Sequence, residues 1–163
     1  MRIRPATTAD IPAMLELEQK CPTAAHWTPR LYQVALRTEE SGDSKRWVLV
    51  VEQKVEVGTA SEGRETPELL AFLVAHDLGP EWELENIVVA PSARRKGLGA
   101  RLVGELLSHA REAGNEHVFL EVRESNQAAR ILYEKSGFEE TGRRSGYYLN
   151  PPEDAILYHR RLR

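Results

Sequence analysis

The sequence has little cysteine and no long apolar run. Its single cysteine, Cys21, cannot form an internal disulfide. The apolar runs at residues 47–51, 69–75 and 87–90 fall far below the ~18 residues that a membrane-spanning helix needs. Residues 1–5 lead directly into polar, helix-starting residues, without the apolar segment of a secretory signal. These absences predict a cytoplasmic protein with no membrane partner.

Histidine is scattered, and the chain has no excess of positive charge. The five histidines, at positions 26, 76, 109, 117 and 159, show no paired ligand spacing, so we predict no metal site. The 22 lysines and arginines are outnumbered by 25 aspartates and glutamates, which gives a formal net charge of -3. Such a balance does not favour a phosphate backbone, and we expect no direct nucleic-acid partner.

The composition does provide for one globular core. The 163 residues are 41% hydrophobic and 29% charged, as in folded proteins and unlike disordered chains. A chain of this length is suited to a single core, and the sequence shows no internal repeat or low-complexity tract. We therefore predict a single domain over residues 1–163.

Four segments carry helix start and stop signals. The first begins at Thr7, with Asp10 in the position of a capping box, and the second at Thr28 with a proline in its first turn. The third begins at Leu98 and runs until Gly114, the fourth covers 126–135 and is ended by Gly137, and both glycines are suited to a C-cap. The residues predicted to face the core are Ile11, Met14 and Leu15; Leu31, Val34 and Ala35; Leu98, Leu102, Val103, Leu106 and Ala110; and Ile131 and Leu132.

Strands are predicted where β-branched and aromatic residues gather. These segments begin at Ile3 and cover 47–51, 69–77, 82–89 and 118–122, with a closing antiparallel pair around 147–148 and 155–158. Two polar segments, 39–45 and 55–67, are predicted loops, the second a long mobile connection. The strand–helix–strand order over 82–122 favours a parallel pair with a right-handed crossover. The predicted class is α+β with a mixed sheet.

A basic turn with two glycines lies between the strand at 82–89 and the helix that follows it. It reads Arg94-Arg95-Lys96-Gly97-Leu98-Gly99. Glycines let a backbone approach phosphate oxygens closely, and the first turn of a helix offers unpaired N–H groups and a positive dipole end. The turn therefore predicts a diphosphate site, although it matches neither the Walker loop nor the dinucleotide pattern. The alternative is a solvated basic turn.

Four blocks of the chain together resemble the GNAT superfamily of acyl-CoA-dependent N-acyltransferases. They are the turn at 94–99, which fits the pattern Arg/Gln-x-x-Gly-x-Gly/Ala, and the segments 8–12, 120–126 and 132–138. Within this superfamily the run Glu121-Val122-Arg123-Glu124-Ser125-Asn126, the Tyr147-Tyr148 pair and residues 153–155 resemble the RimI group, the ribosomal-protein-alanine N-acetyltransferases.

The resemblance implies a fold and a reaction. The fold would be a mixed, mainly antiparallel sheet flanked by helices, with a splayed central strand pair that binds acyl-CoA. Residues 1–163 would form one N-acetyltransferase domain. The reaction would use acetyl-CoA, without a metal, to acetylate the N-terminal alanine of a small-subunit ribosomal protein by direct transfer in a ternary complex.

The resemblance also implies the site residues. Glu121 matches the proton acceptor of the group, and Tyr133 matches its proton donor to the leaving thiolate. A terminal amine has a pKa near ~8, against ~10.4 for lysine, so it is the easier amine to deprotonate. A glutamate base would need surroundings that raise its pKa, such as burial against Phe119. The cofactor residues would be Ile87, Val88, Val89, Arg94, Arg95, Lys96, Gly97, Leu98, Gly99, Ala100 and Asn126.

Each catalytic assignment has an alternative. Glu121 alternates with apolar neighbours and could be a solvent-side strand residue, Tyr133 could be a packing aromatic, and Asn126 could cap its helix. Glu83 and Glu85 are rival bases, because some superfamily members use an acid on that strand. We interpret both as an exposed strand face.

Other residues are expected to have minor roles. Cys21 has no adjacent histidine to activate it, so we predict an inert thiol. Trp27 and the pair Tyr147-Tyr148 either line the acceptor groove or simply pack, and Arg143-Arg144 are expected to be solvated.

Two other functions stay open. The acceptor could be a small amine or a lysine side chain, or the chain could be a noncatalytic acyl-CoA-binding module. The segment 55–67 is longer than in the RimI group and could border the acceptor groove.

Overall fold

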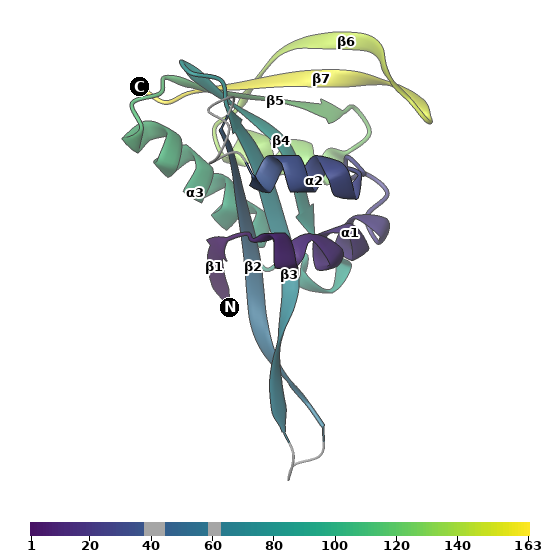
Figure 1. The fold of residues 1–163 in the computed structure, drawn as a ribbon. Coiled ribbons are helices and arrows are strands. Elements are labelled where there is room, and N and C mark those ends of the chain that lie inside the picture. Colours follow the sequence, from purple (N-terminus) through teal and green to yellow (C-terminus); the bar gives the residue numbers. More distant parts are fainter. Residues whose placement is uncertain (38–44, 59–62) are drawn as a thin grey trace.

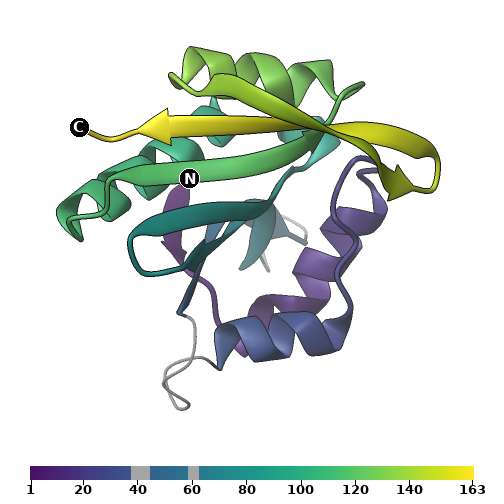
Figure 2. The same cartoon turned by 90° about the horizontal axis from the view of Figure 1, so that it is seen from above.

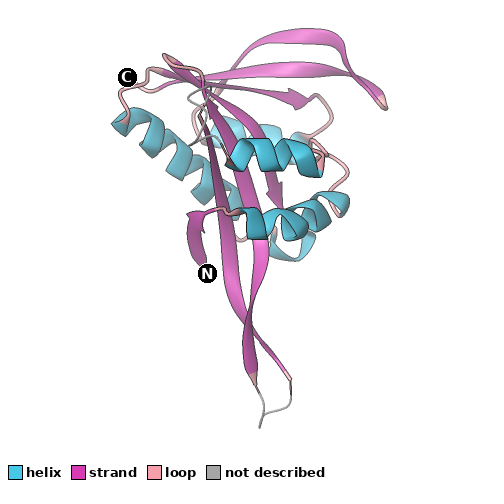
Figure 3. Cartoon of the chain, viewed as in Figure 1, coloured by secondary structure: helices cyan, strands magenta, loops and turns pink. Residues whose placement is uncertain are grey.

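The computed structural model describes residues 1–37, 45–58 and 63–163, which build one seven-stranded sheet with helices on both faces (Figures 1 and 3). The strands are β1 (Arg2–Pro5), β2 (Arg46–Val57), β3 (Arg64–Asp77), β4 (Glu81–Val89), β5 (His117–Arg123), β6 (Glu139–Leu149) and β7 (Pro152–Arg161). The helices are α1 (Ile11–Gln19), α2 (Pro29–Leu36), α3 (Leu98–Glu112) and α4 (Gln127–Lys135), with short 3-10 turns η1 (Thr8–Asp10) and η2 (Pro91–Ala93).

The sheet is mixed and mainly antiparallel, as predicted. Its strand order is β1-β2-β3-β4-β5-β7-β6, and among these neighbours only β4 and β5 run parallel within the described residues. The α+β class, the parallel pair joined through α3 and the closing antiparallel hairpin β6-β7 are therefore confirmed. No helix in the described part of the chain is long and apolar enough to cross a membrane.

Helices α1 and α2 cover one face of the sheet, and α3 and α4 cover the other (Figure 2). On the first face Tyr32 of α2 meets Phe72 of β3 edge-on, with ring centroids 5.9 Å apart. On the second face His109 of α3 stacks on Trp47 of β2 at 4.1 Å. Residues 70–75 of β3 are buried between these layers, which explains why that strand is continuously apolar instead of alternating.

The parallel strands β4 and β5 separate halfway along their length. Their pairing begins at Glu81 and stops at Leu84. Opposite β3, the register of β4 passes from Leu84 to Asn86 in one step, which leaves Glu85 as the extra residue of a β-bulge. Beyond the bulge β4 stays paired with β3, while β5 stays paired with β7. This divergence is the predicted splay.

The helix ends follow the predicted capping signals. The Thr7 N–H donates to Oδ2 of Asp10 at 2.8 Å, and Oγ1 of Thr28 accepts the N–H of Leu31 at 3.2 Å. Gly114 and Gly137, with φ of 84° and 82°, follow the ends of α3 and α4 in the left-handed conformation that a glycine adopts without strain. Local sequence therefore determines where these helices begin and end.

The predicted inner faces of two helices are partly wrong. In α2, Ala35 is buried as predicted, but Leu31 and Val34 are 49% and 50% exposed and Tyr32 is buried instead. The pair Tyr32 and Ala35 has the same spacing as the pair Leu31 and Val34, so periodicity cannot choose between them. In α4, Ile131 is 49% exposed and its place in the interior is taken by Tyr133. In α1, α3 and α4 the other predicted core residues are at least half-buried.

The predicted long loop at 55–67 is also wrong. Strand β2 continues to Val57 and β3 begins at Arg64, so most of the segment is a β-ribbon that extends from the body of the protein (Figure 1). Its residues Val55 and Pro67 line a cavity against α1, away from the splay. The proposed border with the acceptor groove is therefore not found. Most of the other predicted loop, 39–45, lies outside the described residues.

Candidate active site

Two cavities adjoin where β4 and β5 separate. The larger, about 600 Å³, lies between β4, the turn at 94–97 and the first turns of α3 and α4. The smaller, about 330 Å³, lies between the diverging strands, and the segment 22–26 forms one of its walls. Both are lined by Thr23, Ala24, Ile87, Asn126 and Ala129. A molecule in the larger cavity could thus meet a second molecule in the smaller one.

The larger cavity brings together nearly all the residues predicted to bind the cofactor. Lys96 is not among its lining residues. Asn126 caps α4 by accepting the Ala129 N–H at 3.2 Å and also lines both cavities, so its two proposed roles are compatible. The binding roles themselves stay a prediction. The predicted residues that do line it are Ile87, Val88, Val89, Arg94, Arg95, Gly97, Leu98, Gly99, Ala100 and Asn126.

The start of α3 leaves backbone N–H groups open to the larger cavity. Gly97 precedes the helix with φ of 75° and has no side chain that could cap it. The first intrahelical bond that reaches back to this residue is donated by Arg101, so the N–H groups of residues 98–100 have no partner within the helix. A Cβ on Gly99 would lie 3.0 Å from Leu132, so glycine there also permits close packing of α3 on α4. The turn has the geometry of an anion site.

Arg94 and Cys21 form one edge of the larger cavity. The Arg94 guanidinium donates to the Val89 carbonyl at 3.4 Å and to Sγ of Cys21 at 3.4 Å. Cys21 is 3% exposed. The arginine thus ties the end of β4 to the segment that follows α1, and the inert role of the thiol stays a prediction.

Glu121 lies on β5 at the point of divergence and lines the smaller cavity. Its side chain is only 16% exposed, which contradicts a solvent-side position. Oε1 of Glu121 lies 3.1 Å from Nε of Arg144, and a hydrogen bond to the same carboxylate raises the pKa of Tyr147. Arg143 and Arg144 are exposed, as predicted, but both also pair with carboxylates, Arg143 with Glu124 at 2.7 Å.

Tyr133 approaches the smaller cavity from α4. It is 5% exposed, and its ring lies 5.9 Å from that of Phe138 and 6.1 Å from that of Tyr158. Burial raises the pKa of the Tyr133 hydroxyl well above its ordinary value. No hydrogen bond joins this hydroxyl to another described residue, so the protonated group remains available to a molecule in the cavity.

The aromatic residues considered for the acceptor groove behave differently from one another. Tyr148 lines the smaller cavity, and Arg123 lies 4.2 Å from its ring centroid. Burial, followed by the negative charge of Glu121, raises the pKa of Tyr148 to about 12. Trp27 is not part of the lining and packs on Tyr32 with a centroid distance of 5.4 Å.

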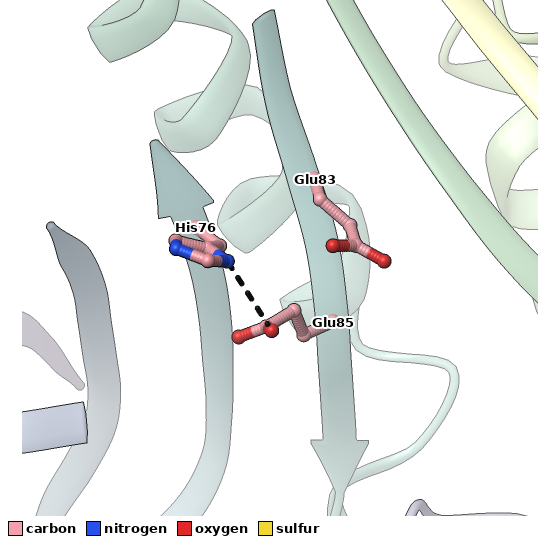
Figure 4. A group of neighbouring side chains, drawn as sticks. All are labelled: His76, Glu83 and Glu85. Atoms are coloured by element: carbon pink, nitrogen blue, oxygen red, sulfur yellow. Dashed lines mark ion pairs between the residues drawn. The ribbon is translucent and has the colours of Figure 1, made fainter. Parts of the chain in front are cut away.

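Glu83 and Glu85 do not form an exposed strand face, which corrects the prediction. Arg46 holds both carboxylate oxygens of Glu85, at 2.8 and 3.1 Å, and Nδ1 of His76 lies 3.6 Å from Glu85 (Figure 4). Burial, then the charges of Glu85 and Glu121, raises the pKa of Glu83. Ligand atoms of His76, Glu83 and Glu85 lie within 4.8 Å of one another, a spacing that could hold a cation. The guanidinium of Arg46 already provides positive charge there, and the absence of a metal stays a prediction.

The fold agrees with comparisons to known proteins. The family model of the GNAT acetyltransferases matches residues 11–138, which is most of the chain. The chain belongs to the GNAT acetyltransferase family. The ribosomal protein bS18-alanine N-acetyltransferase of Haemophilus influenzae is 39% identical over 96 residues, which cover 57% of this chain and 65% of that protein. The match thus spans slightly less than two thirds of this curated relative.

Solved structures of GNAT proteins have the same fold. The crystal structure of the ribosomal-protein-S18-alanine N-acetyltransferase of Escherichia coli gives a TM-score of 0.73 at 28% identity and covers 99% of this chain and 93% of that one. The structure of yncA from Salmonella typhimurium with its cofactor acetyl-CoA gives 0.74 at 22% identity, covering 100% and 94%. The latter likeness concerns the fold alone.

Sequence reasoning missed one wall of this GNAT site. Residues 22–26, between α1 and α2, line the smaller cavity, but they carry neither periodicity nor a motif. It also missed Arg144 as the partner of Glu121, because the two residues are far apart in sequence. Only the closing hairpin β6-β7, which lies beside β5, brings them together.

Proposed function

We propose that this GNAT protein is an acetyl-CoA-dependent Nα-acetyltransferase that acetylates the N-terminal alanine of a small-subunit ribosomal protein. The observation that carries the proposal is the meeting of the two cavities at the splay, with Glu121 and Tyr133 both lining the smaller one. The relatives that are ribosomal protein bS18-alanine N-acetyltransferases support this choice of acceptor.

The larger cavity fits the cofactor. The open N–H groups of residues 98–100 and the guanidinium of Arg95 suit a diphosphate, and the unpaired edge of β4 at residues 87–89 suits the amide groups of a pantetheine arm. When bound, acetyl-CoA supplies an acetyl group activated as a thioester. Backbone N–H groups on that edge of β4 would stabilise negative charge on the acetyl oxygen.

The smaller cavity would hold the acceptor amine. Glu121 would accept its proton, directly or through water, and Arg144 keeps the carboxylate oriented. Tyr133 is protonated at neutral pH, as any tyrosine near its ordinary pKa is, burial raises its pKa further, and its hydroxyl can donate to the leaving sulfur. Because both cavities adjoin, the acetyl group would pass directly to the amine in a ternary complex, without an acetylated Cys21.

The test is a coenzyme A release assay with acetyl-CoA and three acceptors. The first peptide begins with alanine, the second has the same sequence with a blocked N-terminus and an internal lysine, and the third acceptor is a small amine. We expect release only with the free N-terminus. Release with the blocked peptide would assign the enzyme to lysine, and release only with the small amine would assign it to that class. Coenzyme A binding without release would indicate a noncatalytic module.

Direct transfer has its own test. Initial rates measured while both substrates are varied should give intersecting reciprocal plots, and Cys21→Ala should keep turnover. Parallel plots together with loss of turnover in Cys21→Ala would instead show an acetylated enzyme. The cytoplasmic location and the absence of a nucleic-acid partner stay predictions.

A further inference from the structure

Glu18, at the end of α1, is a buried carboxylate that has no cationic partner among the described residues. It is 2% exposed. One of its oxygens, Oε1, accepts hydrogen bonds from Nδ2 of Asn86 at 2.7 Å and from the N–H of Trp27 at 3.4 Å. A hydrogen bond to Glu18, together with burial, raises the pKa of Tyr32. Burying a carboxyl group that only neutral donors hold is costly for a fold, and these donors belong to β4 and to the segment that follows α1, which both border the smaller cavity.

Asn86 connects this carboxylate to the splay. It follows the bulge residue Glu85 and is 6% exposed. Trp82 of the same strand contacts α3, whereas Asn86 contacts α1 and α2. The extra residue of the bulge shifts the alternation of side chains along β4, so Trp82 and Asn86 lie on opposite faces of the sheet. Its Oδ1 accepts the N–H of Ala25 at 3.5 Å, and its Nδ2 also donates to the hydroxyl of Tyr32 at 3.2 Å.

The two backbone N–H groups that this pair receives belong to the segment between α1 and α2. Residues 22–26 of that segment line the smaller cavity opposite Glu121 and Tyr133. His26 has φ of 53°, a left-handed conformation that is unfavourable for a residue with a side chain. Local bonds support the segment, from the Ala24 N–H to the Cys21 carbonyl at 3.0 Å and between His26 Nε2 and the Pro22 carbonyl at 3.3 Å, and the bonds at Ala25 and Trp27 add anchors from the interior.

We propose that Glu18 and Asn86 are positioning residues for the acceptor. They hold residues 22–26 as a wall of the smaller cavity and thereby set the affinity for the acceptor amine and the residues next to it. This inference rests on the proposed function in one respect, since it takes the smaller cavity as the acceptor pocket. Glu18 lines neither cavity, whereas Asn86 also borders the smaller one, so the exchange measurement below separates its hold on the segment from a direct contact with the acceptor.

The test reverses the polarity of the pair. Asn86→Asp places a second carboxylate against Glu18, and Glu18→Gln alone keeps the shape of the side chain but removes the charge. The double variant restores an amide–carboxylate pair with donor and acceptor exchanged. Asn115→Asp is the matched control, because Asn115 is also a buried asparagine, 7% exposed, bonded to Trp82 and Gly79 away from both cavities.

We expect Asn86→Asp to raise the KM for the acceptor by about tenfold, which corresponds to the loss of one buried hydrogen bond to a charged group. The double variant should return it to within about threefold of the original value. Turnover at saturating acceptor and the Kd for coenzyme A should change little. Asn115→Asp should lower Tm and leave the acceptor KM unchanged. An unchanged KM in Asn86→Asp, or a double variant no better than the single one, overturns the proposal.

Amide hydrogen exchange of residues 22–28 provides a readout that needs no acceptor. Exchange should be faster in Asn86→Asp, return in the double variant and stay unchanged in Asn115→Asp. If the N-terminal peptide is not a substrate, the proposed function fails. The exchange comparison still decides whether Glu18 and Asn86 anchor residues 22–26. KM is then measured with the amine that is turned over. Equal exchange in all four proteins would overturn the inference.

Discussion

Replacing Tyr133 with phenylalanine removes a single oxygen from the centre of the site. The ring contacts with Phe138 and Tyr158, at 5.9 and 6.1 Å, do not involve the hydroxyl. No hydrogen bond to another described residue is lost, so the free energy of unfolding should change by less than about 0.5 kcal/mol. If the hydroxyl donates the proton to the leaving thiolate, turnover should fall by roughly 10²-fold or more.

The assay compares turnover at saturating acetyl-CoA and acceptor, the Kd for coenzyme A and Tm. Tyr158→Phe is the matched control, because the Tyr158 hydroxyl donates to Glu134 at 2.7 Å and accepts from Arg130 at 3.1 Å. That variant should lose about 1–2 kcal/mol of stability, which is several degrees of Tm at most, and keep its turnover. Turnover of Tyr133→Phe within threefold of the original would remove Tyr133 from the reaction, whatever its effect on stability.

Three further variants test the base, the cofactor turn and the electrostatics of the splay. Glu121→Gln should lower turnover by roughly 10²-fold without changing the Kd for coenzyme A, and a normal rate would redirect attention to Glu83. Gly97→Ala should weaken coenzyme A binding severalfold, because φ of 75° costs a residue with a Cβ about 1–2 kcal/mol. The control Gly142→Ala, where a Cβ would lie in open space, should leave the Kd for coenzyme A unchanged. Equal Kd values for the two variants would refute this reasoning. Because the pKa of Glu83 is raised, the folded protein favours the protonated form of this side chain. Its contribution to stability is therefore present below its ordinary pKa and is lost as the pH rises through the folded value. We expect Glu83→Gln to raise Tm near pH 7 and to change it little near pH 4. A lower Tm at both pH values would contradict this sign.

The splay shows how backbone pairing and chemistry are connected in this GNAT chain. The bulge at Glu85 ends the pairing of β4 with β5, and the same divergence exposes the backbone of residues 87–89 and the side chain of Glu121 to the cavities. Arg144 then neutralises Glu121 from the hairpin β6-β7. An acceptor ammonium would approach a carboxylate that is held in place but still faces the cavity.

Local signals in the sequence determined much of this protein. The caps at Thr7 and Thr28, the glycines after α3 and α4 and the turn at 94–99 act within a few residues, so they can be interpreted without a partner. The same is true of the order of strands and helices, which favours the parallel pairing found between β4 and β5. Most of residues 94–100 line the larger cavity and were predictable because the turn is contiguous, whereas residues 87–89 and Asn126 were predicted from the family resemblance.

Tertiary structure alone decided the remaining features. Two residue pairs in α2 had equal periodicity, and the one that faces inward places Tyr32 against Phe72 and Asn86, which come from distant parts of the chain. Residues 55–57 and 64–67 form a ribbon because two polar strands pair with each other, a gain that neither strand shows by itself. The partner of Glu121 and the wall at 22–26 come from parts of the chain distant in sequence, because an ion pair or a cavity wall depends on distance in space, which only the packed sheet provides.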